Sequence, residues 1–104
     1  MNRAGNVYFN GRLAGRLAQT DAGFSFTYDP DYLAGGTPIS FRIPLQPETF
    51  EYDQLPVFFA GLVSEGWMRR LQSKEQQIDE NDAFGLLLAN GEDLVGAVTI
   101  FPEV

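Results

Sequence analysis

The chain contains no cysteine and no histidine among its 104 residues. Without cysteine there is no disulfide, no thiolate nucleophile and no metal site built on sulfur. Without histidine the commonest general base of enzymes is also missing. These absences favour a protein that works by contact with another protein over an enzyme. We therefore expect no catalytic residues, no cofactor and no bound metal.

Basic residues and long apolar runs are also scarce. Seven Lys and Arg stand against 14 Asp and Glu, which gives a net charge of −7. Since nucleic-acid binding depends on cations that neutralise phosphates, we expect no direct binding of DNA or RNA. No apolar run approaches the roughly 18 residues of a membrane span, and no signal peptide is recognisable. The lack of cysteine agrees with a reducing compartment, so we expect the cytoplasm.

What the chain does contain is enough apolar material for a core. Hydrophobic residues make up 44% of it and aromatic residues 13%. Disordered chains are poor in aromatic residues, so a folded state is expected. The length is typical of one domain, and we expect residues 1–104 to form it.

The first third of the chain predicts a three-stranded meander. Residues 7–9 lead into Asn10-Gly11, a pair typical of a type I′ hairpin turn. Gly15 indicates a bulge or a close backbone approach. A second turn at residues 20–23 precedes the alternating run 24–28, whose three aromatic side chains share one face and are assigned to the core.

The middle of the chain predicts little regular structure. Residues 29–33 suit a single helical turn. Residues 39–45 are bounded by prolines, which favours an edge strand or a loop. Residues 46–54 are polar and are expected to be irregular. Apolar spacing over residues 55–63 then indicates a first helix with a proline in its first turn.

Two further helices and a strand are expected after this point. One helix runs from a cap at Ser64 to about residue 77 and buries Met68 and Leu71. The next starts near Asp82 and buries three apolar residues, and Asn90-Gly91 closes it. Residues 95–101 form the last strand. The predicted fold is therefore α+β: a small twisted antiparallel sheet, made of the N-terminal meander and the C-terminal strand, packed with two to three short helices.

The remaining acidic residues show no catalytic pattern. They fall in predicted turns and helix caps, where carboxylates are expected for local reasons. The run at residues 79–82 lacks the glycine and distal glutamate of an EF-hand loop. No phosphate-binding loop is present, and Phe84 is interpreted as a core residue rather than as part of a kinase signature.

Several segments in order resemble the N-terminal subdomain of HipA-type serine/threonine kinases. They are residues 7–17, 26–33, 56–66, 82–87 and 91–98. In that family the ATP-binding and catalytic parts lie downstream, and this sequence contains none of them. The resemblance therefore extends to HipS, the separate form of this subdomain in three-component HipBST toxin–antitoxin systems. It differs at Ser64, where the long kinases usually have proline.

The resemblance implies a function and two partners. The protein would be an antitoxin that neutralises a HipT-like kinase toxin by direct binding, with a HipB-like helix-turn-helix protein in a ternary complex. Two alternatives stay open: a regulatory subdomain excised from a longer HipA kinase, and an adaptor that bridges the kinase and the DNA-binding protein. The neighbouring reading frame would separate the antitoxin from the excised subdomain.

The predicted contact segment surrounds the single tryptophan. Trp67 is either a core residue in line with Met68 and Leu71 or an interface anchor, and we favour the anchor because tryptophan is enriched in binding hot spots. Arg69 and Arg70 either are solvated or contact the kinase. Glu65 either stabilises the positive end of its helix or reaches the partner. The expected partner-binding residues are Ser64, Glu65, Gly66, Trp67, Arg69 and Arg70, docking near the nucleotide-binding region of the kinase.

Overall fold

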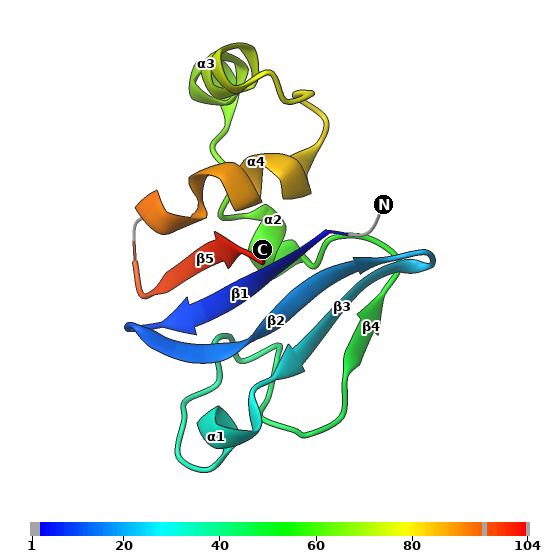
Figure 1. Ribbon diagram of the computed structural model, residues 1–104, viewed down its shortest axis with the longest axis vertical. Coiled ribbons are helices and arrows are strands. Elements are labelled where there is room, and N and C mark those ends of the chain that lie inside the picture. The colour runs from blue at the N-terminus through cyan, green and yellow to red at the C-terminus, as the bar shows by residue number, and fades with distance from the viewer. Residues whose placement is uncertain (1–2, 95, 104) are drawn as a thin grey trace.

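The computed structural model describes residues 3–94 and 96–103. Within them, one five-stranded antiparallel sheet combines with four α-helices, which confirms the predicted α+β class (Figure 1). The sheet order is β4-β3-β2-β1-β5, so the last strand pairs with the first. The strands are β1 (Ala4–Phe9), β2 (Arg12–Thr20), β3 (Gly23–Tyr28), β4 (Phe50–Tyr52) and β5 (Val98–Pro102). The helices are α1 (Pro30–Leu33), α2 (Val57–Ala60), α3 (Gly66–Gln76), α4 (Ala83–Asn90) and a 3₁₀ turn, η1 (Gly91–Asp93).

The predicted meander is confirmed at its first turn. Asn10 and Gly11 have φ values of 51° and 81°, the positive values that a type I′ turn requires. Between β1 and β2 the register shifts after Val7, which faces Gly15, whereas Tyr8 faces Leu13. The strand β2 therefore carries one extra residue, and this is the bulge predicted there.

Gly15 also fulfils the second expectation, a close backbone approach. A Cβ at this position would overlap the backbone oxygen of Thr27 and would lie 2.7 Å from the ring of Phe26. Any side chain here would push β3 away from β2. The glycine therefore lets the aromatic face of β3 pack closely on its neighbour.

The strand β4 was not predicted, because residues 46–54 were expected to be irregular. Residues Phe50–Tyr52 pair with Phe24–Phe26 of β3. Three residues are too few to show an alternation of apolar and polar side chains, so this strand is defined by its neighbour. Residues 39–45 form only an isolated bridge between Ser40 and Ile43, which agrees with the loop alternative.

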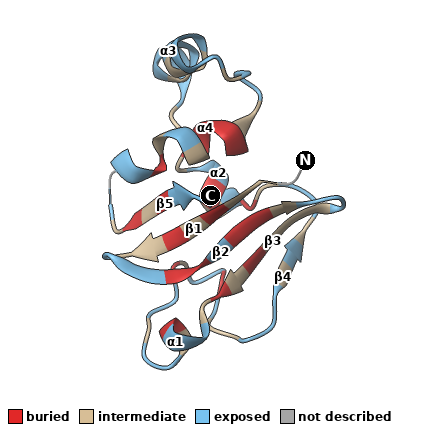
Figure 2. Cartoon of the chain, viewed as in Figure 1, coloured by how far each residue is buried: buried red, intermediate tan, exposed pale blue. Residues whose placement is uncertain are grey.

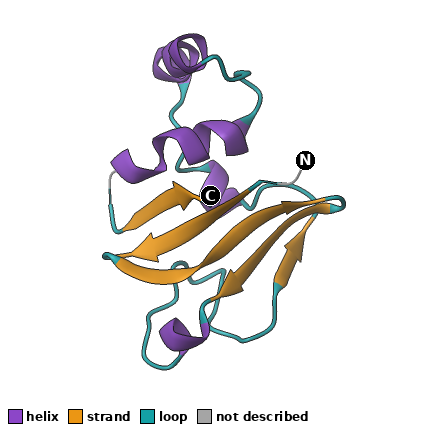
Figure 3. Cartoon of the chain, in the orientation of Figure 1, coloured by secondary structure: helices purple, strands orange, loops and turns teal. Residues whose placement is uncertain are grey.

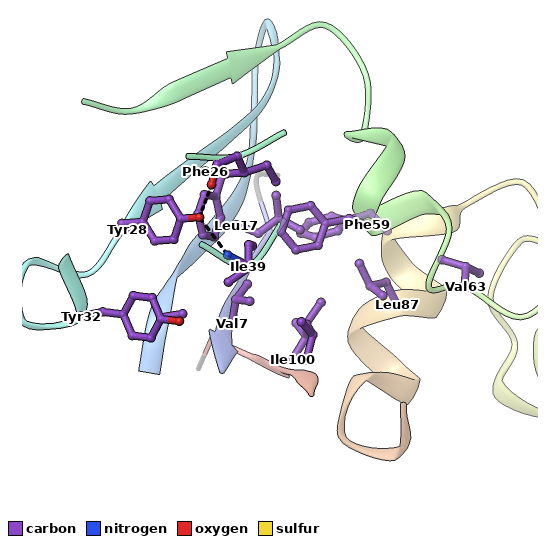
Figure 4. Close-up of a cluster of buried hydrophobic side chains, with 14 of the residues drawn as sticks. Val7, Leu17, Phe26, Tyr28, Tyr32, Ile39, Phe59, Val63, Leu87 and Ile100 are labelled. Carbon is purple, nitrogen blue, oxygen red and sulfur yellow. Dashed lines mark hydrogen bonds between the residues drawn. The ribbon is translucent and has the colours of Figure 1, made fainter. Parts of the chain in front are cut away.

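The core lies on one face of the sheet and joins it to α2, α4 and the loop after α1. Phe26 and Tyr28 of β3 are fully buried, as is Phe59 of α2 (Figure 4). The Tyr28 hydroxyl accepts a hydrogen bond from the Ile39 backbone N–H at 3.2 Å and donates one to the Ile43 carbonyl. The predicted core role of residues 24–28 is thereby confirmed, with Phe24 partly buried against the same cluster.

The helix α4 begins and ends where it was predicted to. The Asp82 carboxylate accepts a hydrogen bond from the Gly85 backbone N–H at 3.1 Å, and Phe84 and Leu87 are buried behind it. The helix ends at Asn90 with Gly91 as its C-cap, as predicted, but Gly91 has a right-handed φ of −65° and leads directly into η1. A Cβ at Gly91 would overlap the carbonyl of Ile100, so glycine is needed here for close packing against β5. Of the predicted last strand, residue 95 lies outside the described residues.

Candidate protein-interaction surface

The helix α3 stands apart from the sheet and the core (Figure 1). None of its residues is buried, whereas α4 beside it has a buried side (Figure 2). The prediction that Met68 and Leu71 belong to the core is therefore wrong: their exposed fractions are 40% and 39%. The apolar spacing predicted a helix with one apolar side, but none of the described side chains on that helix is buried.

Trp67, Met68 and Leu71 are the exposed large apolar residues of α3, and we call them together the α3 face. Trp67 is 65% exposed, so the interpretation of this residue as core is wrong. Leu71 follows Trp67 by four residues and Met68 by three, which places all three side chains on neighbouring positions of the helix surface. A tryptophan, a methionine and a leucine exposed together are costly in water and typical of a surface that another molecule covers.

The start of α3 differs from the prediction. Ser64 was expected to cap the helix, but the N-cap is Glu65, which has extended backbone and forms no side-chain capping bond. The helix starts only at Gly66, whose φ of +60° turns the chain after Glu65. Ser64 thus lies one residue too early to serve as the cap. It is partly buried, whereas Glu65 and Gly66 are exposed.

Polar bonds attach α3 to the rest of the protein. Arg69 donates from Nε to the Glu80 carbonyl at 2.8 Å. At the far end, the side-chain amides of Gln76 and Asn90 bond each other in both directions, at 2.8 and 3.0 Å. At 3.6 residues per turn, Arg69 and Gln76 lie on the other side of the helix from Trp67 and Leu71, so these bonds do not involve the α3 face.

The two arginines of the predicted contact segment are therefore not equivalent. Arg69 is partly buried and its guanidinium holds the loop after α3, so its main role is internal. Arg70 is exposed. The structure brings Gly66, Trp67 and Arg70 to the surface together, while Ser64 and Arg69 lie partly behind it. Contact with a partner stays a prediction for each of them.

Charge on α3 is opposite to that of the whole chain. The helix carries three of the seven basic residues, Arg69, Arg70 and Lys74, and only one of the 14 acidic residues, Glu75. Its net charge is therefore positive in a protein of net charge −7. The α3 face is thus an apolar patch with a cationic border, mounted on an acidic body.

The perturbed carboxylates are explained by ion pairs rather than by catalysis. The hydrogen bonds from Arg3 hold the pKa of Asp82 below its usual range, and those from Arg16 do the same for the pKa of Glu103. No group of three or more acidic side chains suited to a metal ion occurs within residues 3–94 and 96–103. In the same residues no helix is both long and apolar enough to cross a bilayer.

Met68 and Leu71 are surface residues that sequence reasoning missed. Their spacing indicated an amphipathic helix, and that signal is the same for a core helix and for a helix that awaits a partner. Two features of the sequence favoured the second case: Arg69 and Arg70 lie directly between them, and Gly66 separates the helix from the preceding apolar segment.

Comparison with known proteins gives consistent matches along the chain. The sequence profile of the family described as HipA N-terminal domain matches residues 5–101. An uncharacterized protein of Haemophilus influenzae is 43% identical over 101 residues, which cover 97% of this chain and 93% of that protein. The candidate kinase Y4mE of Sinorhizobium fredii is 30% identical over 101 residues, covering 94% of this chain but only 24% of its own length.

Solved structures give the same result. The N-terminal domain of HipA toxin superimposes with a TM-score of 0.79 at 39% sequence identity, covering 98% of this chain and 93% of that one. A chain in the complex of HipA, HipB and operator DNA from Shewanella oneidensis shares the fold, with a TM-score of 0.79 at 24% identity; the match covers 95% of this chain and 24% of that one. By its sequence, its meander and its helical end, this chain belongs to the HipA N-terminal domain family.

Proposed function

We propose that the protein is an antitoxin that neutralises a HipA-type serine/threonine kinase toxin by direct binding in the cytoplasm, with residues 1–104 acting as one domain. The observation that carries this proposal is the α3 face, which exposes Trp67 on a helix without a buried residue. Tryptophan supplies a large contact area and dominates many interfaces. The catalytic part of such a kinase is the natural partner of a HipA N-terminal domain.

The border of the α3 face indicates where on the kinase it docks. Kinases hold their nucleotide through Mg²⁺ ions that are bound by acidic side chains. The exposed cation of Arg70 and that of Lys74 complement such a site, while the acidic remainder of the chain does not. Docking of α3 near the nucleotide-binding region would hold the kinase in an unproductive state, with Trp67 as the anchor and the charged residues as its rim.

A second partner is proposed from the Shewanella complex, in which HipA, HipB and operator DNA occur together. A HipB-like DNA-binding protein would join the kinase and this chain in a ternary assembly. The acidic balance of the chain agrees with a role away from the DNA itself. If the chain bound the HipB-like protein in the absence of kinase, the adaptor role would be favoured instead.

A regulatory part of a longer kinase is a second candidate function. It is favoured by Y4mE and the Shewanella chain, because the match spans only 24% of each. In that case the α3 face would contact the remainder of the same polypeptide. The surface would be the same, but the chain would not inhibit a separate kinase.

Co-expression with the cognate HipA-type kinase tests the antitoxin role. We expect the chain to restore growth, and Trp67→Ala to lose this rescue and to weaken kinase binding at least tenfold in a titration. Phe41→Ala is a matched control, since Phe41 is an aromatic residue that is 87% exposed and far from α3 in sequence. Absence of rescue by the wild-type chain would contradict the proposal, as would equal loss in both variants.

A further inference from the structure

The free edge of the sheet next to β4 is a second surface open to a partner. β4 is the outermost strand, and in the described residues it pairs with β3 alone (Figure 1). Half of the backbone N–H and C=O groups of an edge strand point away from the sheet and can pair with another extended chain. The opposite edge, β5, differs because α4 and η1 pack against it (Figure 3).

A groove of about 650 Å³ runs beside this edge. Its apolar part is formed by Tyr52 of β4, Ile43 of the preceding loop and Phe58 of α2. Val57 stands on its border with 84% of its surface exposed. An extended chain paired with β4 would thus place every second side chain beside an apolar groove, which is how strand addition gains specificity.

The charges of the groove define what it accepts. Glu51 and Asp53 line it, both are exposed, and neither forms an ion pair within residues 3–94 and 96–103. Arg42 also lines the groove, but its guanidinium lies over the ring of Phe41, 5.5 Å from the ring centre. Two carboxylates on one strand edge favour an incoming segment with basic side chains.

A second copy of the chain does not suit this edge. Glu51 is the middle residue of β4, so a symmetric antiparallel pairing of two β4 strands would set one Glu51 opposite the other. Like charges placed directly across a pair of strands are destabilising. The short acidic edge therefore selects against self-association and in favour of a basic partner.

We propose that the groove beside β4 receives an extended segment of a partner protein in which basic and apolar side chains alternate. The segment adds a sixth strand to the sheet, its apolar side chains enter the groove between Tyr52 and Val57, and its cations pair with Glu51 and Asp53. This site lies on different elements from the α3 face and does not depend on kinase binding.

Titration of the isotope-labelled full chain with a hexapeptide that alternates lysine and valine tests the site. We expect saturable shifts of the backbone amide signals of residues 50–55, 57 and 58 in nuclear magnetic resonance spectra, since residue 56 is a proline and has no amide proton. Glu51→Lys should weaken binding at least tenfold, and Glu92→Lys, an exposed acidic residue of η1, should leave it unchanged. Val57→Asn removes the apolar side chain without adding a charge, at a position that is 84% exposed. It is an independent variant should Glu51→Lys perturb the sheet, and we expect it to weaken binding at least fivefold.

The same peptide with alternate backbone amides methylated is the second control, because it keeps the side chains but cannot pair as a strand. It should not bind. The proposal is overturned if the unmodified peptide gives no saturable shifts, if the shifts spread over acidic residues throughout the chain, or if the methylated peptide binds equally well.

Discussion

The Arg3 guanidinium donates hydrogen bonds to both carboxylate oxygens of Asp82, with Nη1–Oδ2 and Nη2–Oδ1 distances of 2.8 and 3.0 Å. Its guanidinium also lies 5.3 Å from the centre of the Phe84 ring. The contact joins residues 79 positions apart and fixes the N-terminal end of α4 to the start of the sheet. Asp82 thus serves two purposes, since the same carboxylate caps α4 through the Gly85 N–H.

These two roles can be separated by mutation. Asp82→Asn keeps a capping oxygen but loses the ion pair, and we expect its free energy of unfolding to fall by about 1 kcal/mol. Asp82→Ala loses both interactions and should cost about 2 kcal/mol. Urea unfolding measures the difference, with Asp93→Asn at an exposed position of η1 as the control. Equal losses in Asn and Ala variants would show that the cap contributes nothing.

The ion pair also predicts a dependence of stability on pH. Hydrogen bonds from Arg3 lower the pKa of Asp82 in the folded state, so the folded protein binds this proton less readily than the unfolded chain does. The resulting stability is fully present above the unfolded pKa of about 3.9 and is lost as the pH falls through the lower folded pKa. Glu103, held by Arg16, follows the same direction at the surface. Urea midpoints between pH 6 and 2 should fall less steeply for Arg3→Gln than for the wild type, and parallel profiles would refute this.

Gly15→Ala should disrupt the pairing of β2 and β3. The added Cβ meets the backbone of Thr27 and the Phe26 ring, neither of which can move without opening the core. We expect a loss of about 2 kcal/mol or more. Gly35→Ala is the matched control, since nothing lies within 4 Å of a Cβ there and its φ is not positive. Thermal unfolding of both variants checks the prediction, and similar melting temperatures would contradict it.

The exposure of α3 leads to a contrast between two leucines. Leu71→Ala should lower the free energy of unfolding by no more than about 1 kcal/mol, because 39% of the Leu71 surface is already exposed to water in the folded protein. Leu87→Ala on α4 should cost about 3 kcal/mol, because Leu87 is 1% exposed. A large loss for Leu71→Ala would mean that α3 packs on the body of the protein in solution.

Local signals in the sequence predicted the elements that short-range physics determines. The Asn10-Gly11 turn, the bulge near Gly15 and the start of a helix at Asp82 each depend on neighbours a few residues away, and each is confirmed. The strand β4 exists only because β3 offers it a partner, so no property of residues 50–52 alone could reveal it.

The α3 region also combines a local feature that the sequence predicts with a tertiary feature that it does not. Periodicity predicted a helix over these residues, but it describes which side chains share a face and not what that face meets. Met68 and Leu71 were therefore assigned to the core, whereas in the structure both are exposed. The position of Ser64 relative to Gly66 likewise depends on a backbone turn with φ of +60°, which glycine permits and does not require.

The separation of charge between α3 and the acidic body gives the molecule an electric polarity. In the field of a charged partner the protein would rotate toward its docking orientation before the surfaces touch. Added salt shortens the distance over which this field acts to a few ångströms. It would therefore lower the association rate of the complex while hardly changing its dissociation rate.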